Sequence, residues 1–431
     1  MNFYSLHNNA AKVSFKEAVI KGIAPDGGLY FPEQIPQLPT IFFQNIQDLS
    51  NHEIGYRALM PFVKDDIPPA VLKEILEEVL DFDFPLIPIN EKVSALELFH
   101  GPTMAFKDVG ARFMALCLGY FFKNSEQKVK VLVATSGDTG GAVANGFLGV
   151  KGVEVVILYP SGKVSDIQER QLTTLGQNIT ALEVNGTFDD CQKMVKKAFV
   201  DNSLINSVQL TSANSINVAR WLPQMLYYLF AYKELKALNK KLVFSVPSGN
   251  FGNICAGMMA QQMGMPVGHF IAATNRNDTV PKFMQTGVYD PKPSHATISN
   301  AMDVGDPSNF VRIQHLYHDD FSQLHSELSS YSFTDIETKE AIKKIYKQAG
   351  YIADPHGAVG YLGLQKYMEN HPDVYGIFLE TAHPVKFLDV VSSTLNISLP
   401  LPPQIEKIMD KKKVSIRISE YEELRSFLLT K

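Results

Sequence analysis

The sequence has few cysteines and only a small net charge. Its 431 residues include three cysteines, which are widely spaced and form no Cys-x-x-Cys pair, so neither a disulfide framework nor a zinc site is indicated. The formal net charge of −5 argues against binding to nucleic acid or to an anionic membrane. The histidines and aspartates between His315 and Asp320 fit neither a helical nor a strand spacing, and we expect no metal ion there.

Long hydrophobic runs are also missing. No apolar run approaches the roughly 18 residues that a membrane-spanning helix needs, and the N-terminus has no basic region followed by an apolar one. We therefore expect a cytoplasmic protein without a membrane partner. Hydrophobic residues make up 45% and charged residues 20% of the chain, which is typical of a globular protein, and its length allows two or three domains.

Short apolar segments alternate with helix-like segments from residue 96 onward. We expect strands over 129–134, 153–159, 179–184, 242–246, 269–274 and 375–379. A long apolar helix is expected over 216–235. Apolar strands separated by helices predict an α/β protein with parallel sheets covered on both faces. Residues 1–95 are expected to form a separate N-terminal unit. Its first helix is indicated by a Ser14-x-x-Glu17 capping box, and a proline-rich segment lies near its end.

Two glycine-rich turns follow expected strands, and ligand sites of parallel sheets lie at the carboxyl ends of strands. The 135–141 turn brings hydroxyls and backbone N–H groups to a helix start, which suits a carboxylate but equally a helix cap in a tight turn. The glycines of the 247–253 turn allow close approach to a phosphate. That turn matches neither Gly-x-Gly-x-x-Gly nor the P-loop, which disfavours a nicotinamide cofactor or ATP.

Two further turns are weaker signals on their own. The 211–220 segment has amides and hydroxyls at a helix start, and Arg220 in its first turns could bind a phosphate through two hydrogen bonds. A helix cap with a surface arginine is the simpler interpretation. Thr381, in Thr381-Ala382-His383-Pro384, follows a strand and would by default be a helix N-cap.

Lys107 is the candidate reactive residue. It follows the Gly101-Pro102 turn and stands at an expected helix start, where the helix dipole disfavours the ammonium form. Partial burial among neighbouring phenylalanines would lower its pKa in the same direction. This is the setting of a lysine that forms Schiff bases. An isolated lysine is usually a solvated surface charge, so this assignment depends on the other motifs.

Together these motifs resemble the threonine synthase family, which uses pyridoxal phosphate. The resemblance is carried by Leu98-Phe-His-Gly-Pro-Thr-Met-Ala-Phe-Lys-Asp108, by Asp26-Gly-Gly-Leu-Tyr-Phe-Pro32 and by Thr381-Ala-His-Pro384. It implies two doubly wound α/β domains of the tryptophan-synthase-β-like kind (fold type II) beside a small N-terminal domain. The implied domains are 1–95, a large domain of 96–125 and 225–400, a smaller one of 126–224, and a C-terminal extension of 401–431.

The resemblance also implies roles for site residues. Lys107 would bind pyridoxal phosphate through a Schiff base, Thr381 would hydrogen-bond the pyridine nitrogen, and Asp138 would lie near the cofactor's 3′-oxygen. The residues implied to hold the cofactor phosphate are Gly249, Asn250, Phe251, Gly252 and Asn253. Those implied to bind substrate are Thr135, Ser136, Gly137 and Thr139 for its carboxylate, and Asn214, Ser215 and Arg220 for its phosphate, with Lys163 a weaker candidate.

The implied reaction converts O-phospho-L-homoserine and water to L-threonine and phosphate. Two alternatives are a serine or threonine dehydratase on the same fold, which would give no reason for the phosphate segment around Arg220, and a non-catalytic binder of phosphorylated amino acids, which would not need the Lys107 amine. The sequence fits a monomer or a homodimer equally well.

Overall fold

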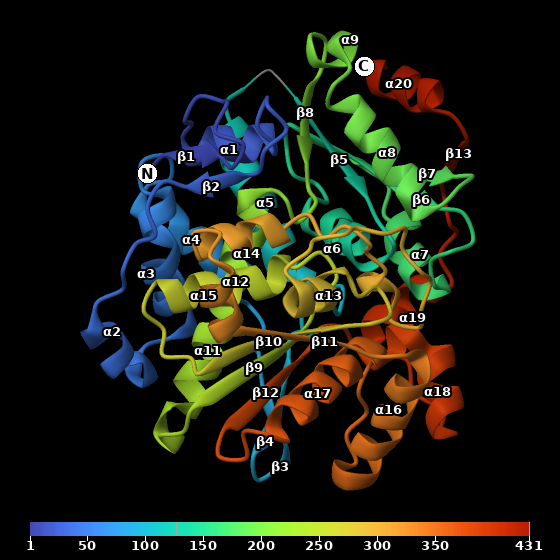
Figure 1. Ribbon diagram of the computed structural model, residues 1–431. Helices are drawn as coiled ribbons and strands as arrows, with labels where there is room; N and C mark the ends of the chain where they lie inside the picture. Colours follow the sequence, from blue (N-terminus) through green and yellow to red (C-terminus); the bar gives the residue numbers. More distant parts are fainter. Residues whose placement is uncertain (126–127, 431) are drawn as a thin grey trace.

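The computed structural model describes residues 1–125 and 128–430, whose strands form three sheets (Figure 1). The largest sheet has six strands in the order β11-β10-β9-β12-β4-β3. All its neighbours are parallel except β3 and β4. The strands are β3 (Leu86–Asn90), β4 (Val93–Glu97), β9 (Leu242–Pro247), β10 (His269–Thr274), β11 (Leu328–Ser332) and β12 (Tyr375–Glu380).

A second sheet has five parallel strands in the order β13-β7-β6-β5-β8. They are β5 (Val129–Ala134), β6 (Val153–Pro160), β7 (Ile179–Val184), β8 (Gln209–Ser212) and β13 (Ile416–Ile418). Because β13 pairs with β7, the C-terminal segment becomes an edge strand of this sheet. The chain therefore leaves this sheet after β8, builds most of the larger one, and returns.

Helices cover both faces of each large sheet, as the apolar strands require. In the six-stranded sheet Phe244 faces the cluster of α11 (Met225–Leu235) and α12 (Gly252–Gln262), whereas its neighbour Val243 faces α16 (Asp335–Ala349) and α17 (Pro355–Met368). In the five-stranded sheet Val131 faces α5 (Lys107–Phe122) and α6 (Asp138–Gly146), and Leu132 faces α8 (Phe188–Ala198) and α20 (Tyr421–Leu429). Both sheets are thus doubly wound.

The N-terminal segment lies along one side of this core, at the left of Figure 1. Its strands β1 (Phe3–Ser5) and β2 (Tyr30–Pro32) form an antiparallel pair, and α1 (Phe15–Lys21) has the expected capping box between Ser14 and Glu17. Helices α3 (Asn51–Val63) and α4 (Pro69–Val79) pack on α11 and α5. The other helices are α2 (Thr40–Gln44), η1 (Ile46–Asp48), α7 (Asp166–Thr173), α9 (Asn202–Ile205), α10 (Val218–Trp221), η2 (Leu222–Gln224), η3 (Lys236–Leu238), α13 (Thr279–Thr286), η4 (Asn300–Met302), α14 (Phe310–Leu316), α15 (Phe321–Glu327), η5 (Pro384–Phe387), α18 (Leu388–Leu395) and α19 (Pro403–Met409).

The α/β class, the parallel sheets and all six expected strands are confirmed. The helical segment expected over 216–235 is present from Val218 to Leu235, but it is divided into α10, η2 and α11 instead of forming one α-helix. Pro223 stands at the break and has no N–H to continue the helical hydrogen bonds. The division into domains remains a prediction. None of the described helices is long and apolar enough to cross a membrane.

Candidate active site

The two large sheets point the carboxyl ends of their strands at one cavity. The segments that follow β4, β5, β8, β9 and β12 all contribute to its lining. The expected site residues that line it are Lys107, Thr135, Ser136, Asp138, Thr139, Asn214, Ser215, Arg220, Gly249, Asn250, Phe251, Gly252, Asn253 and Thr381. Gly137 lies in the backbone of the same turn without lining the cavity, and Lys163 is exposed in the loop after β6. The fold therefore brings together nearly all of the expected residues.

Lys107 is the first residue of α5, and pairing with the segment after β12 fixes its position. The Phe106 N–H donates to the Thr381 carbonyl at 2.8 Å, and Ala105 forms an isolated bridge with Ala382. Just before this bridge, Met104 takes a left-handed conformation with φ of 59°. Two motifs far apart in sequence, around Lys107 and Thr381, thus form one local structure.

The loop before Lys107 is held by a buried carboxyl group. The backbone N–H of Thr103 donates to Asp108 Oδ2 at 2.9 Å, and the Thr103 hydroxyl donates to the other oxygen of the same carboxyl group. A Cβ atom on Gly101 would lie 2.5 Å from Asp108 Oδ2, so the turn needs glycine at this point. These contacts explain the Gly-Pro-Thr sequence as a support for the lysine.

The environment of Lys107 favours its neutral amine. The side chain is 16% exposed, and its nearest acid is Asp138, whose Oδ2 lies 3.8 Å from Lys107 Nζ. Burial lowers the pKa of Lys107; Asp138 acts in the opposite direction, and Lys386 and Arg220 add to the lowering. A lysine with a lowered pKa can act as nucleophile and as acid or base near neutral pH.

The 247–253 turn leaves a helix start open to an anion. Phe251 precedes α12 in a left-handed conformation with φ of 61° and gives no side-chain cap. The first N–H groups of α12 and the positive end of its dipole lie at the cavity, and only the Ile254 N–H among them bonds a side chain, Asn253 Oδ1 at 3.0 Å. A Cβ on Gly249 would lie 2.7 Å from the Ala301 carbonyl oxygen, so the turn packs too closely for any larger residue. This geometry suits a phosphate group.

The 135–141 turn is occupied by its own side chains. The Thr135 hydroxyl accepts hydrogen bonds from the N–H groups of Gly137 and Gly140 at 2.9 and 2.8 Å. Asp138 opens α6 and places a carboxylate in its first turn. The side chains of Ser136 and Thr139 line the cavity and make no hydrogen bond within the described part of the chain. Only these two hydroxyls of the turn are therefore free for a ligand.

Arg220 is a buried cation without an acidic partner among the described residues. One of its terminal nitrogens donates to the Ala213 carbonyl, and its Nε has no partner there. Burial lowers the pKa of Arg220 to about 10, which still leaves it charged at neutral pH. A Cβ on Gly110 of α5 would lie 2.4 Å from the Arg220 carbonyl oxygen, so this glycine allows α10 to approach. An arginine so placed is ready for an anionic ligand.

These residues fit pyridoxal phosphate. The buried Lys107 amine, whose pKa is lowered, can bond its aldehyde, and the start of α12 can hold its phosphate. The Thr381 hydroxyl, which is 5% exposed and lines the cavity, can reach a ring nitrogen. The structure shows no group of three or more His, Cys, Asp or Glu side chains that could hold a metal ion within residues 1–125 and 128–430.

Some lining and supporting residues had no signal in the sequence. Lys386 donates to Asp138 Oδ1 at 2.6 Å, although it stands between two apolar residues in η5. Residues from Asn300 to Val304, in η4 and just after it, line the cavity beside the 247–253 turn. Phe188 and Gln192 of α8 line it from the side of the five-stranded sheet. The only sequence signal for Lys386 is a charge within an otherwise apolar stretch, Val385-Lys386-Phe387.

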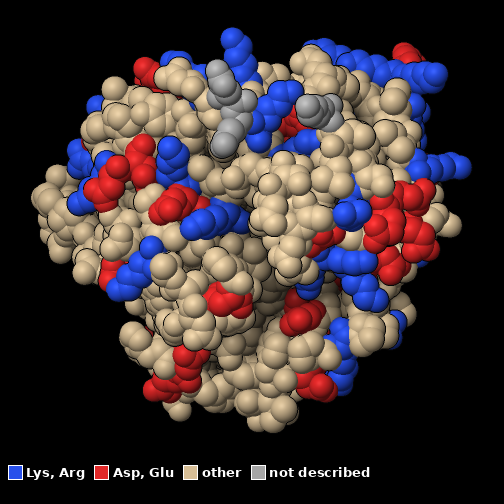
Figure 2. Space-filling view, turned by 90° about the horizontal axis from the view of Figure 1, so that it is seen from above, with Lys and Arg blue, Asp and Glu red and all other residues tan. Residues whose placement is uncertain are grey.

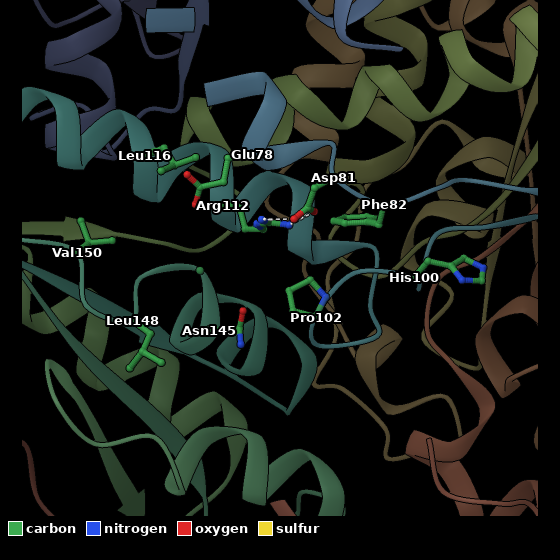
Figure 3. A pocket seen from close by; sticks show the side chains of 11 residues that line it. Glu78, Asp81, Phe82, His100, Pro102, Arg112, Leu116, Asn145, Leu148 and Val150 are labelled. Carbon is green, nitrogen blue, oxygen red and sulfur yellow. Dashed lines mark hydrogen bonds and ion pairs between the residues drawn. The ribbon is translucent and has the colours of Figure 1, made fainter. Parts of the chain in front are cut away.

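A second cavity, of about 430 Å³, lies between α4, α5 and α6 and is lined by none of the expected site residues (Figure 3). Its arginine, Arg112, is already paired with both oxygens of Asp81, at 2.5 and 3.0 Å. On the face shown in Figure 2, positive and negative side chains are interspersed. Neither feature competes with the cavity around Lys107.

Comparisons with known proteins identify the families that this chain resembles. Residues 88–374 match the family of pyridoxal-phosphate dependent enzymes, residues 2–80 match the threonine synthase N terminus, and residues 357–428 match the threonine synthase C-terminal family. The chain is 42% identical to the threonine synthase of Haemophilus influenzae, covering 100% of both chains. A crystal structure of threonine synthase from Escherichia coli has a TM-score of 0.94 at 41% identity, covering 100% of this chain and 99% of the other. A structure of PLP-bound threonine synthase from Brucella melitensis has a TM-score of 0.92 at 33% identity, with the same coverage.

Proposed function

Because the chain belongs to the threonine synthase family of pyridoxal-phosphate enzymes, we propose that Lys107 is its catalytic lysine and that the surrounding cavity binds the cofactor and substrate. The reaction is the conversion of O-phospho-L-homoserine and water to L-threonine and phosphate, the last step of threonine biosynthesis. We assign it to the carbon–oxygen lyases that act on phosphates and expect it in the cytoplasm.

The observation that carries the proposal is the position of Lys107 and Arg220 on one cavity, where the lysine is largely buried and the arginine has no acidic partner among the described residues. Lys107 supplies a group that can bond an aldehyde and move protons, and Arg220 supplies a charge for a substrate phosphate. A dehydratase acts on substrates without a phosphate and therefore gives no reason for Arg220. A non-catalytic binder gives no reason for the Lys107 amine.

Each part of the substrate has a proposed partner. The hydroxyls of Ser136 and Thr139 receive the carboxylate, and Arg220, with Asn214 and Ser215, receives the phosphate. Asn214 is oriented by a 3.0 Å bond from its Nδ2 to the Ala134 carbonyl, and Ser215 accepts a 2.7 Å bond from Asn250 Nδ2. The segments after β8 and β9 are thereby joined directly, next to the proposed phosphate sites.

Pyridoxal phosphate, when bound, supplies an electron sink for the carbanion at the substrate Cα. The Lys107 amine removes the Cα proton and carries protons to and from the neighbouring carbons, because its lowered pKa makes the free amine easier to form. Arg220 stabilises the negative charge that grows on the departing phosphate. The residues from Asn300 to Val304 that line the cavity limit the entry of water other than the reacting molecule.

The first experiment measures threonine formation from O-phospho-L-homoserine by the purified protein with pyridoxal phosphate. We expect Lys107→Ala to abolish it, because no other lysine lines the cavity within the described residues. If neither protein makes threonine although the wild type takes up the cofactor, the substrate assignment is wrong. Activity in Lys107→Ala would reject the catalytic role of Lys107.

A second pair of variants separates the two phosphate candidates. Arg220→Gln should raise KM for O-phospho-L-homoserine by about 100-fold, since a charge-assisted bond to phosphate contributes roughly 3 kcal/mol. Lys163→Gln should raise KM less, because Lys163 is exposed and does not line the cavity. An equal or larger effect at Lys163 would reverse this assignment.

A further inference from the structure

Lys386 is a second buried lysine next to Lys107. Its side chain is fully buried, with 0% exposure. Its ammonium group donates to Asp138 Oδ1 at 2.6 Å and to the Thr103 carbonyl at 2.9 Å. Thr103 belongs to the loop that leads into Lys107, and Asp138 belongs to α6 on the other sheet. Lys386 therefore links the loop before Lys107 to α6, and its partner in α6, Asp138, also faces Lys107.

The two lysines share one carboxylate unequally. Asp138 Oδ1 accepts from Lys386 and also from Gln168 Nε2 at 2.9 Å. Asp138 Oδ2 lies 3.8 Å from Lys107 Nζ, beyond hydrogen-bond distance. One buried carboxylate compensates one buried ammonium well and two poorly. Lys386 is therefore the closer partner of this carboxylate, at 2.6 Å against 3.8 Å for Lys107.

We propose that Lys386 is a positioning residue that engages the Asp138 carboxylate and thereby keeps the Lys107 amine neutral and ready to bond the cofactor aldehyde. The proposal rests on the proposed function in taking Lys107 as the cofactor lysine. In that step the amine nitrogen forms a bond to the aldehyde carbon and one molecule of water leaves. Only the neutral amine has the lone pair that the step needs.

The charges around Lys107 support this division of roles. Asp138 of α6 and Asp354, which caps α17, favour the ammonium form, whereas Lys386 of η5 and Arg220 of α10 disfavour it. Asp354 is itself engaged by His356 at 2.6 Å. Burial alone would raise the pKa of Asp138, but Lys386 and Lys107 hold it below its usual value. Without Lys386, the ionised Asp138 would act on Lys107 alone.

The test follows the capture of pyridoxal phosphate by the apoprotein from about pH 6 to 10, using the absorbance of the bound cofactor. The capture rate should rise with pH around the pKa of the free Lys107 amine. Lys386→Met should move the midpoint upward by about one pH unit, the usual size of the effect of a lost neighbouring charge. Lys386→Arg, which keeps the charge, should restore a midpoint closer to that of the wild type.

Two further variants separate a charge effect from a packing effect. Gln168→Leu removes the neutral partner of the same Asp138 oxygen and should leave the midpoint where it is, even if capture becomes slower. Lys386→Gln keeps a hydrogen-bond donor without the charge and replaces Lys386→Met if that variant does not fold. An unshifted midpoint in the neutral Lys386 variants would overturn the inference alone. Failure of the wild type to capture the cofactor would overturn it together with the proposed function.

Discussion

The two glycine-rich turns have the same local plan but differ in the charge at the start of the helix that each one opens. Each follows a parallel strand and opens a helix at the cavity: the 135–141 turn between β5 and α6, and the 247–253 turn between β9 and α12. The start of α6 already holds a carboxylate, Asp138, in its first turn, whereas α12 has no acidic residue there and no side-chain cap. In the 135–141 turn the Asp138 carboxylate faces two lysines, Lys107 and Lys386. In the 247–253 turn no acidic side chain stands at the helix start, which leaves it open to a phosphate.

The largest expected effect is a loss of cofactor affinity when an acidic residue is placed at the start of α12, as in α6. Gly252→Asp places a carboxylate at the first position of α12, as Asp138 is at the first position of α6. Repulsion between unit charges about 4 Å apart near a protein surface is roughly 4 kcal/mol, so affinity for pyridoxal phosphate should fall on the order of 1000-fold.

Gly252→Asn is the matched control for this prediction, because it adds nearly the same volume without charge. A Cβ at this position would lie 3.3 Å from Asn309 Nδ2 and from Ser215 Cβ, so both variants meet the same crowding. Equilibrium titration of each apoprotein with pyridoxal phosphate measures the difference. Equal losses of affinity in the two variants would mean that the start of α12 does not hold the cofactor phosphate.

The next largest effect should be a loss of stability when the Asp138 carboxylate of the 135–141 turn is removed. Asp138→Asn leaves the Lys386 ammonium buried with no carboxylate within hydrogen-bond distance in the described structure. Removing one partner of a buried ion pair typically lowers the free energy of unfolding by about 3–5 kcal/mol. Urea unfolding of the apoprotein measures this loss. The double variant Asp138→Asn/Lys386→Met should recover part of it, and strictly additive losses would argue against the pairing.

The sequence was sufficient for the features that depend on neighbours in the chain. Lys107 at a helix start, the capping box of α1 and the two glycine-rich turns follow from local patterns of residues, and each is present. Lys386 could not be found in this way, because its partner Asp138 lies 248 positions earlier in the sequence and meets it only after both sheets have formed. The edge strand β13 was missed for a different reason, because a three-residue strand has too few side chains to show a period.

A pH experiment compares two buried carboxyl groups, Asp303 and Asp138, whose hydrogen-bond partners differ in charge. Asp303, in the loop beside the 247–253 turn, is surrounded mainly by neutral donors from Thr297, Asn275 and Asn277. Burial raises the pKa of Asp303 to about 6, whereas the pKa of Asp138 lies below its usual value. The native state therefore binds the Asp303 proton more tightly than the unfolded chain, so this residue lowers stability as pH rises from about 4 to 6.

The expected size of this effect is about 2 kcal/mol, after allowance for the partial exposure of Asp303. Asp303→Asn should remove it, so that the urea midpoint of the variant falls less than that of the wild type over the same pH interval. Asp138 has the opposite sign: its contribution is present above about pH 4 and is lost below that. Parallel pH profiles of wild type and Asp303→Asn would show that the carboxyl group of Asp303 does not titrate abnormally.

The smallest expected effect concerns the hydroxyl that closes the first turn on itself. Thr135→Val keeps the shape of the side chain but removes the acceptor for the N–H groups of Gly137 and Gly140. We expect a loss of about 1–2 kcal/mol in unfolding free energy, typical of buried donors left unpaired, with Thr135→Ser close to wild type. If the Thr135 hydroxyl is fully engaged by the N–H groups of Gly137 and Gly140, neither variant should change KM for O-phospho-L-homoserine as much as Arg220→Gln does. A large rise of KM in Thr135→Val with unchanged stability would instead assign this hydroxyl to the substrate.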